Sequence, residues 1–507
     1  MTLDAVLNAV ADVLDLHDPS PADDFLDLGG SSLAAVQIAA RLERLLGVRV
    51  DPRVVVKSGS LLEVAEALGA SAVGEAAVGV AGPQPPSASS PASLAQQWAL
   101  DAERVDPDAP ALQFAVAYTV RGPLEPELLD QALRAVVDHH PVLRTRFERG
   151  PDSDTMELVA TGPVLLRREQ VTESRPRTDR LTAFAQQRFP AFRPPRLRAL
   201  LLEAGEAEHD LCLSFDHRAA DGWSLRVVLE DLSVAYRQLV AGEPVRLPGA
   251  GSYLSYAIEE RQDAPRRLRR AVAHWSRELP AAYEEFPLTL PGHRAGTPLA
   301  DPRHVQLAVP PEVADALGVI AAAAGESTFA VATAALARVV AGWTGDTRVR
   351  ILTSSANRGH ADHERTVGWF ANGIFPTYNV RPGSPVVELV RHVAETAAAA
   401  STVGDVPAAH VRQQLWSDAP TGFRRDSAVY LACNDAWSEP LTLAACAVDS
   451  LDLDDRADAP GLQLYLLRGR AGWKLDLYYH DSEYAPAVPD ELVRRLLTTI
   501  REQASQV

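Results

Sequence analysis

Residues 216–224 have the sequence DHRAADGWS, which combines residue types that could carry out acid–base chemistry. The segment directly follows an alternating, strand-like run that ends at Phe215, so its side chains are expected at the end of a strand. Asp216 precedes His217, and Asp221 follows four residues later. A histidine there can accept or position a proton, although a lone histidine is more often structural or solvated.

Residues 27–33, with the sequence DLGGSSL, form a second candidate site. They precede a helical pattern with Ile38, Leu42 and Leu45 on one face. Two glycines allow a tight turn, and a hydroxyl at a helix N-terminus lies where the helix dipole favours an anion. On the residues alone, Ser31 or Ser32 is either an ordinary N-cap or the attachment point of an anionic group.

Composition limits the classes of protein that these segments can belong to. The chain has 507 residues, enough for two or three domains, with 47% hydrophobic and 23% charged residues. We expect a cytoplasmic protein, because no apolar run has the length of a membrane span and no signal peptide opens the chain. The net charge of −18 argues against nucleic acid and anionic membranes as partners. The three cysteines lack metal-ligand spacing, so we expect no metal site and no disulfide framework.

The elements that position these residues fall into two units. Residues 1–72 read as a small helical bundle, and residues 73–92, rich in Ala, Gly, Ser and Pro, read as a flexible linker. The rest interleaves strand-like and helical patterns and is predicted to be α/β, with a charged helix over 253–278 joining its halves. Strands are predicted at 114–120, 210–215, 303–309, 461–466 and 473–479, and helices at 125–138 and 328–343.

Residues 1–72 resemble a peptidyl carrier protein, whose signature is two glycines, a variable residue, a modified serine and a leucine. The resemblance implies that Ser32 carries covalent 4′-phosphopantetheine and that Ser31 fills the variable position. It implies a phosphopantetheinyl transferase as a partner. Because these 507 residues include no adenylation domain, Ser32 is expected to be loaded by a separate adenylation enzyme or an upstream synthetase.

Residues 93–507 resemble the condensation domain of non-ribosomal peptide synthetases. The family's His-His-x-x-x-Asp-Gly motif places its second histidine on His217, its aspartate on Asp221 and its glycine on Gly222. The pair His139-His140 is excluded as the motif, because no Asp-Gly follows at the right distance. Further family motifs match in order at 93–98 (SLAQQW), 138–147 (DHHPVLRTRF), 252–257 (SYLSYA) and 367–372 (VGWFAN).

The resemblance implies a fold and a set of roles. The fold is a small all-α four-helix carrier followed by an α/β condensation domain of two chloramphenicol-acetyltransferase-like lobes, at 93–270 and 271–507, with the histidine in a tunnel between them. His217 is expected to accept or position the amine proton, and the Gly222 N–H to help stabilise the oxyanion. Asp221 and Arg358 are expected to form a structural pair, and Asn372 to lie near the channel.

Asp216 departs from the motif, which has a histidine there. One interpretation is a tolerant structural position in an active enzyme, where Asp216→His would keep activity within about tenfold. A second is heterocyclisation, whose Asp-x-x-x-x-Asp-x-x-Ser pattern fits Asp216, Asp221 and Ser224, although such domains would not retain His217. A third is a non-catalytic recruiting module. Epimerisation is disfavoured, because its second acid–base carboxylate would fall on Ser354.

The expected function is acyl transfer. The thioester on Ser32 is the predicted donor, and the acceptor is a downstream carrier or a free small amine supplied in trans. An amide is the expected product, with an ester as the alternative.

Overall fold

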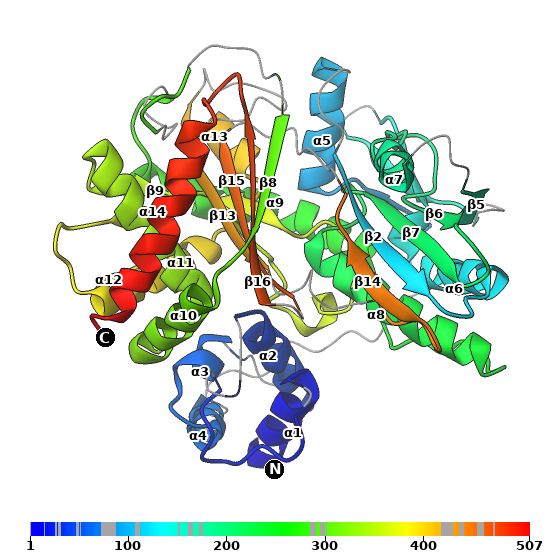
Figure 1. Ribbon diagram of the computed structural model, residues 1–507, viewed down its shortest axis with the longest axis horizontal. Helices are drawn as coiled ribbons and strands as arrows, with labels where there is room; N and C mark the ends of the chain where they lie inside the picture. The colour runs from blue at the N-terminus through cyan, green and yellow to red at the C-terminus, as the bar shows by residue number, and fades with distance from the viewer. Residues whose placement is uncertain are drawn as a thin grey trace.

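The computed structural model (Figure 1) describes residues 2–14, 16–25, 28, 32–46, 50, 52–71, 88–106, 112–150, 153–160, 166–171, 176–283, 290–294, 300, 302–416, 429–434, 441–453, 461–469 and 472–507. A small helical unit at the N-terminus lies below two larger α/β lobes, which stand side by side. This arrangement confirms the predicted fold class of a helical carrier followed by a two-lobed α/β unit.

The described part of the N-terminal unit contains four helices joined by loops: α1 (Thr2–Leu14), α2 (Ser32–Leu46), α3 (Pro52–Lys57) and α4 (Leu61–Ser71). The apolar face of α1 meets those of α2 and α4, and Val6, Ile38 and Leu68 lie in their shared core. Phe25, from the polar loop between α1 and α2, completes this core and is 1% exposed.

The first lobe, or N-lobe, is built around a five-stranded sheet with the order β14-β2-β7-β6-β5. Leu211, Leu213 and Phe215 on β7 face the core shared with α6 and α8, whereas Cys212 faces a smaller core under α7. The elements are β1 (Ser89–Pro91), α5 (Leu94–Val105), β2 (Gln113–Arg121), α6 (Pro126–His139), η1 (Pro141–Arg144), β3 (Thr145–Glu148), β4 (Thr155–Leu158), β5 (Leu166–Gln170), α7 (Arg177–Ala185), β6 (Leu197–Glu203), β7 (Glu208–Asp216), α8 (Gly222–Val240) and, from far along the chain, β14 (Ala447–Leu451).

The second lobe, or C-lobe, contains a four-stranded sheet with the order β13-β15-β16-β8, and α10, α11 and α14 pack on one of its faces. Its elements, with the preceding connecting helix, are α9 (Tyr253–Glu278), β8 (Pro302–Ala308), α10 (Pro311–Ala324), α11 (Thr328–Thr344), β9 (Arg348–Arg350), β10 (Thr353–Ser355), η3 (Ala361–His363), β11 (Asn372–Ile374), β12 (Thr377–Asn379), α12 (Val386–Ser401), α13 (Ala408–Leu415), β13 (Val429–Asn434), β15 (Leu462–Gly469), β16 (Gly472–His480) and α14 (Ala487–Ala504).

The sequence-based boundaries need three corrections. Strand β1 lies inside the predicted linker 73–92 and pairs with β4, so the N-lobe starts earlier than residue 93. The boundary between residues 270 and 271 falls within the continuous helix α9. Strand β14, which lies in the range 271–507, pairs with β2 and therefore belongs to the sheet of the N-lobe.

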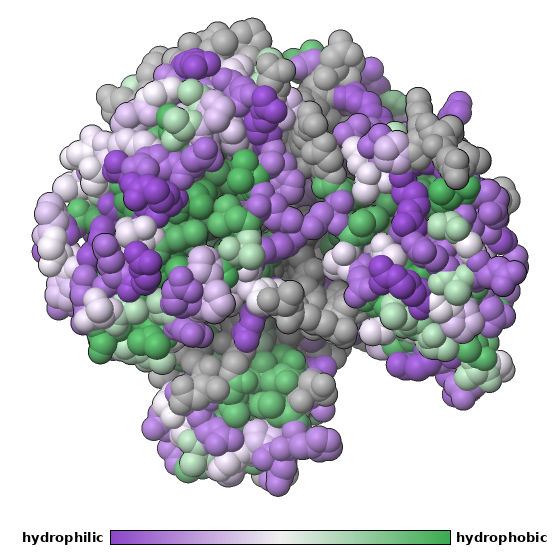
Figure 2. Space-filling model, viewed as in Figure 1, coloured by the Kyte–Doolittle hydropathy of each residue, from purple (hydrophilic) through white to green (hydrophobic). Residues whose placement is uncertain are grey.

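One apolar patch on the surface and the apolar character of the described helices both bear on the search for a functional site. In Figure 2 hydrophobic side chains gather beside α14, over the four-stranded sheet, where a small apolar pocket is lined by Val313, Leu317 and Leu496 among others. This pocket carries no titratable group, so it is not a candidate for acyl transfer. Among the described residues, no single helix is both long and apolar enough to cross a membrane, and one sharply bent pair, α10 with α11, passes by length and composition only.

Candidate active site

His217 directly follows β7 and lies in a turn where aromatic rings from two parts of the chain contact its side chain. Its ring lies 5.5 Å from that of Phe114 on β2 and 4.7 Å from that of Trp369, measured between ring centroids. Phe114 belongs to the N-lobe, and Trp369 to the segment 358–372, which follows β10 of the C-lobe and packs Trp369 and Phe370 into the N-lobe core. The predicted histidine is therefore half-buried between aromatic rings from these two parts of the chain.

Backbone hydrogen bonds fix the turn at residues 216–219. The amide of Asp216 donates to the carbonyl of Arg196 on the adjacent chain segment at 2.9 Å, and the amide of His217 donates to that of Leu112 at 3.0 Å. The amide of Ala219 closes the turn by donating to the carbonyl of Asp216 at 2.9 Å. The His217 backbone is thus held on both sides.

The segment 93–98 supports this turn. Gln96 on α5 is fully buried, and its side-chain amide donates to the carbonyl of Arg218 at 2.6 Å. Gln96 also forms a reciprocal capping box with Ser93 at the start of α5. These contacts give the first matched motif a structural role next to His217.

Asp221 is the N-cap of α8, and its side chain accepts from the amide and the hydroxyl of Ser224, each at 2.8 Å. Its second oxygen accepts from the backbone amides of Phe370 at 3.0 Å and Ala371 at 3.2 Å. A carboxylate of the N-lobe therefore holds backbone of the C-lobe directly.

Arg358 completes this cluster, as the sequence predicted. Its guanidinium donates to Asp221 at 3.0 Å and to the carbonyl of Thr366 at 2.7 Å, and it lies 4.3 Å from the centroid of the Phe370 ring. Burial alone raises the pKa of Asp221, but Arg358 and the hydrogen bonds from Ser224 and Phe370 outweigh it and hold that pKa below its ordinary value. The pair is thus charged and fully buried.

Gly222 is the first residue of α8, beside the capping carboxylate of Asp221. An N–H at this position has no acceptor within its own helix and lies at the positive end of the helix dipole. The arrangement can donate a hydrogen bond to a developing negative charge close to the motif turn.

The segment 367–372 reaches the site through Trp369, whose ring lies against that of His217. Gly368 packs so closely on the Tyr253 ring that a Cβ would lie 1.9 Å from it, which explains the glycine. Asn372 is 7% exposed at the start of β11, where it pairs in register with Ser355 of β10. Ser354, the position where an epimerisation domain would need a carboxylate, is exposed and hydrogen-bonded to Tyr430 at 3.0 Å.

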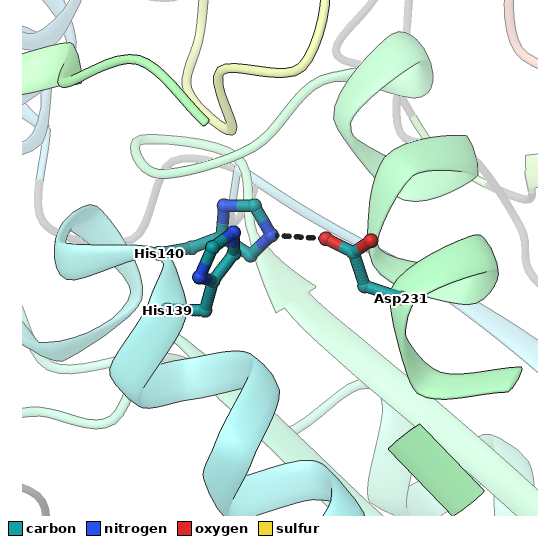
Figure 3. A group of neighbouring side chains, drawn as sticks. All are labelled: His139, His140 and Asp231. Carbon is teal, nitrogen blue, oxygen red and sulfur yellow. Dashed lines mark hydrogen bonds and ion pairs between the residues drawn. The ribbon is translucent and has the colours of Figure 1, made fainter. Parts of the chain in front are cut away.

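The pair His139-His140 lies at the end of α6, beside Asp231 (Figure 3). His140 is hydrogen-bonded to Asp231 of α8 at 2.8 Å, and His139 to the carbonyl of Pro248 at 2.7 Å. Asp231 also pairs with Arg365. The three side chains offer metal ligands within 4.8 Å of one another, but a guanidinium already occupies the carboxylate, so the cluster is a hydrogen-bonded ion network.

The predicted attachment site lies at the start of α2. Ser31 lies outside the described residues, as does the side chain of Ser32, whose backbone is the first residue of the helix. Helix α2 contacts η3, which belongs to the same segment 358–372 that holds Arg358 and Trp369. The position of α2 at the junction of the two lobes is visible in Figure 1.

Sequence reasoning missed the partners of Asp216. This carboxylate is fully buried and accepts hydrogen bonds from Arg196, at the approach to β6, and from Arg218. Arg218 stands two residues away, so its proximity was a usable signal. Arg196 is 20 residues upstream, and only the pairing of β6 with β7 brings it close.

Family models match both units of the chain. The condensation domain matches residues 87–425, and the phosphopantetheine attachment site matches residues 4–68. One component of the linear gramicidin synthase of Brevibacillus parabrevis is 28% identical over 417 residues, which cover 78% of this chain and 8% of that protein. The probable non-canonical nonribosomal peptide synthetase CymA of Salinispora arenicola is 28% identical over 425 residues, which cover 82% of this chain and 5% of that protein. The chain therefore spans a small part of the length of these relatives.

Solved structures share the two-lobed fold. The first condensation domain of the CDA synthetase has a TM-score of 0.69 at 21% identity and covers 83% of this chain and 97% of that chain. The X-domain from teicoplanin biosynthesis has a TM-score of 0.70 at 23% identity, with coverages of 84% and 96%. The family matches, together with this fold, show that the chain belongs to the condensation domain family of non-ribosomal peptide synthetases and joins that domain to a carrier to which 4′-phosphopantetheine is covalently attached.

Proposed function

We propose that this chain forms an amide bond, with an acyl or aminoacyl thioester on Ser32 as the donor and an amine supplied in trans as the acceptor. The observation that carries the proposal is the position of His217, half-buried at a strand end between the lobes and in contact with Trp369. Trp369 belongs to the segment whose η3 contacts α2 of the carrier. The tether and this contact both favour delivery of the carried group to His217.

The proposed reaction exchanges one acyl bond for another. The amine nitrogen attacks the thioester carbonyl carbon, a C–N bond forms, the C–S bond breaks, and the sulfur leaves as a thiol that takes up one proton. Phosphopantetheine, when bound, supplies the thiol that carries the acyl group. The His217 imidazole accepts or positions the proton that the attacking amine loses.

Negative charge develops on the carbonyl oxygen during this attack. The Gly222 N–H, at the first position of α8, is the proposed donor to that oxygen. Asp221 and Arg358 are proposed to act indirectly, by holding the start of α8 against the segment 367–372. Asn372 lies three residues after Trp369 in the same segment and is proposed to line the channel between the lobes that the family resemblance implies.

The attachment site is tested first. Incubation with a phosphopantetheinyl transferase and coenzyme A should add one phosphopantetheine to the parent and to Ser31→Ala, and none to Ser32→Ala, as read by intact-protein mass. The Ser31→Ala variant is the matched control. The full adduct on Ser32→Ala, with loss on Ser31→Ala, would move the site to Ser31.

The direction of transfer is tested next. A labelled acyl group is loaded on Ser32, and candidate amines are offered either free or bound to a separate carrier. Label that leaves Ser32 for the amine supports the proposal. In the converse experiment the labelled acyl group is loaded on the separate carrier and the amine on Ser32, and label that then arrives at Ser32 reverses the assigned donor and acceptor.

The role of His217 is tested in the same assay. His217→Ala should slow product formation by about 10²–10⁴-fold, as expected for the loss of a positioned acid–base group, while loading of Ser32 is unchanged. His139→Ala is the matched control, because His139 lies outside the motif turn on α6. Equal turnover of the parent and His217→Ala would favour catalysis by approximation alone, and no turnover in either protein would favour a non-catalytic recruiting module.

Product analysis separates the chemical alternatives. An amide supports the proposal, whereas an ester from an alcohol acceptor or an azoline from a cysteine, serine or threonine acceptor would replace it.

A further inference from the structure

Asp216 carries a carboxylate at the motif position next to His217, and the structure surrounds it with arginines. It is fully buried. Arg196 donates from Nη1 to Oδ2 at 2.9 Å, and Arg218 donates from Nε to Oδ1 at 2.9 Å and from Nη2 to Oδ2 at 3.0 Å. The backbone amide of Arg218 also donates to Oδ1 at 3.0 Å. Both oxygens are therefore occupied by charged donors.

The two guanidiniums are themselves held by the surrounding backbone. Arg196 donates to the carbonyls of Thr145 at 3.0 Å and Pro190 at 2.8 Å. Arg218 donates to the carbonyl of Phe189 at 2.6 Å and to Glu103 on α5 at 2.8 Å. Neither arginine can leave the carboxylate without breaking several of these bonds.

An aromatic ring contacts both cations. The guanidinium carbons of Arg196 and Arg218 lie 5.0 and 5.9 Å from the centroid of the Phe147 ring. The cluster thus connects the approach to β6, the end of β7, α5 and β3 within the N-lobe.

The charge state of Asp216 follows from these contacts. Burial on its own raises the pKa of this carboxyl, but the Arg218 and Arg196 guanidiniums and the hydrogen bonds from Arg218 outweigh it and hold the pKa below its ordinary value. A carboxylate that stays ionised and fully paired cannot serve as the proton acceptor of the reaction. This argues against the heterocyclisation interpretation.

The hydrogen bond from the Arg218 amide to the Asp216 side chain spans His217. It forms an Asx turn in which the carboxylate of residue 216 accepts from the amide of residue 218. The residue between them, His217, takes its backbone direction from this turn and from its own bond to Leu112. Loss of the Asp216 side-chain contact would therefore remove one of the bonds that fix the backbone carrying the imidazole.

We propose that Asp216, held by Arg196 and Arg218, is a positioning residue that fixes the turn presenting His217 to the acyl-transfer site. The role in catalysis rests on the proposed function above, whereas the role in folding does not. The proposal also replaces the sequence-based expectation that position 216 tolerates histidine. A histidine there would leave the buried Arg196 without the carboxylate that pairs with it and Arg218 with only Glu103 as an anionic partner.

The folding role is tested by a double-mutant cycle on the complete carrier–condensation chain. Asp216→His should lower the midpoint of thermal unfolding by at least about 4 °C. Adding Arg196→Met to this variant should restore at least half of the loss, because it replaces the unpaired arginine with an uncharged side chain of similar length. Asp449→Asn is the matched control, since its pair with Arg121 is exposed. Strict additivity of the two substitutions, or an unchanged midpoint in Asp216→His, would overturn the proposal.

The positioning role is tested with Asp216→Asn, which keeps an oxygen for the Arg218 amide but loses the charge. Under conditions where the variant is folded, kcat should fall by about tenfold to about 10²-fold with little change in the acceptor KM. The pH profile of kcat should keep its shape. If one limb of that profile is lost, Asp216 acts as a proton acceptor instead. If kcat is unchanged, Asp216 has no positioning role.

The two proposals fail in different ways. If the parent makes no product with any amine tested, the acyl-transfer function fails, while the unfolding cycle still decides whether the cluster is required for the fold.

Discussion

Two buried aspartate–arginine clusters flank His217, one residue before it and four residues after it, and they differ in what they connect. Within the described part of the chain, the side chains that bind Asp216 come from the N-lobe, namely Arg196 and Arg218. Asp221 binds Arg358 and two backbone amides of the C-lobe. The first cluster fixes the turn that carries the histidine, and the second fixes the lobe that faces it.

This difference shows how a catalytic turn is held in a two-lobed protein. A charge inside one lobe can position a side chain without restricting the other lobe. A charge shared between lobes holds α8 against the segment 358–372, which carries Trp369 to the side of His217. The two aspartates should therefore respond differently to the same substitution.

The largest effect is expected at Asp221. Asp221→Asn leaves Arg358 buried without its counter-ion and should lower the free energy of unfolding by on the order of 3–5 kcal/mol, measured by urea denaturation. Because this cluster joins the lobes, proteolysis of the segment 358–372 should also become faster in the native state. A variant that unfolds like the parent would show that the pair contributes little.

Lowering the pH should reduce stability through the two buried clusters more than through the exposed ion pairs. The pKa of each buried carboxyl, Asp216 and Asp221, is held below its ordinary value by paired arginines after burial is overcome. A folded-state pKa below the unfolded value of about 3.9 stabilises the protein above that pH, and the stability is lost as pH falls through the folded value.

The measurement is the unfolding midpoint of the parent, Asp216→Asn and Asp221→Asn from about pH 6 to about pH 3. The parent should lose stability below about pH 4, and each variant should lose less over that range than the parent does. Parallel curves for all three proteins would show that neither carboxylate is linked to folding in this way.

The smallest effect is expected at the exposed pair of Arg121 and Asp449, between β2 and β14. Both side chains are more than half exposed, so Asp449→Asn should change the free energy of unfolding by at most about 1 kcal/mol, and less in high salt. A larger loss would indicate that the side-chain pair, as well as the backbone ladder, holds β14 in place.

The sequence predicted those parts of the fold that depend on local pattern. The alternating run that ends at Phe215 is β7, and the charged pattern over 253–278 is α9 with the same bounds. The pairing of Asp221 with Arg358 followed from motif resemblance, and the structure places the two side chains 3.0 Å apart. Periodicity and motifs carried these predictions because each is contained in a short stretch of chain.

Contacts between distant segments could not be predicted in the same way. Arg196 reaches Asp216 only because β6 pairs with β7, and nothing near residue 196 indicates that register. The contact of Trp369 with His217, and of α2 with η3, requires the lobes and the carrier to be assembled. Strand β14 was missed as part of the N-lobe, since its five residues have a weak pattern and a partner far away.

Strand β14 has a consequence for how the chain reaches its native state. The side chains of Arg121 on β2 and Asp449 on β14 form an ion pair, although the two residues are 328 positions apart in the chain. Leu441 and Leu443, just before β14, lie in the N-lobe core. Closing so long a loop is slow, so during synthesis β2 remains an open sheet edge until most of the C-lobe has been made. An N-lobe expressed by itself would keep that edge and an unfilled core, and would aggregate where the complete chain folds.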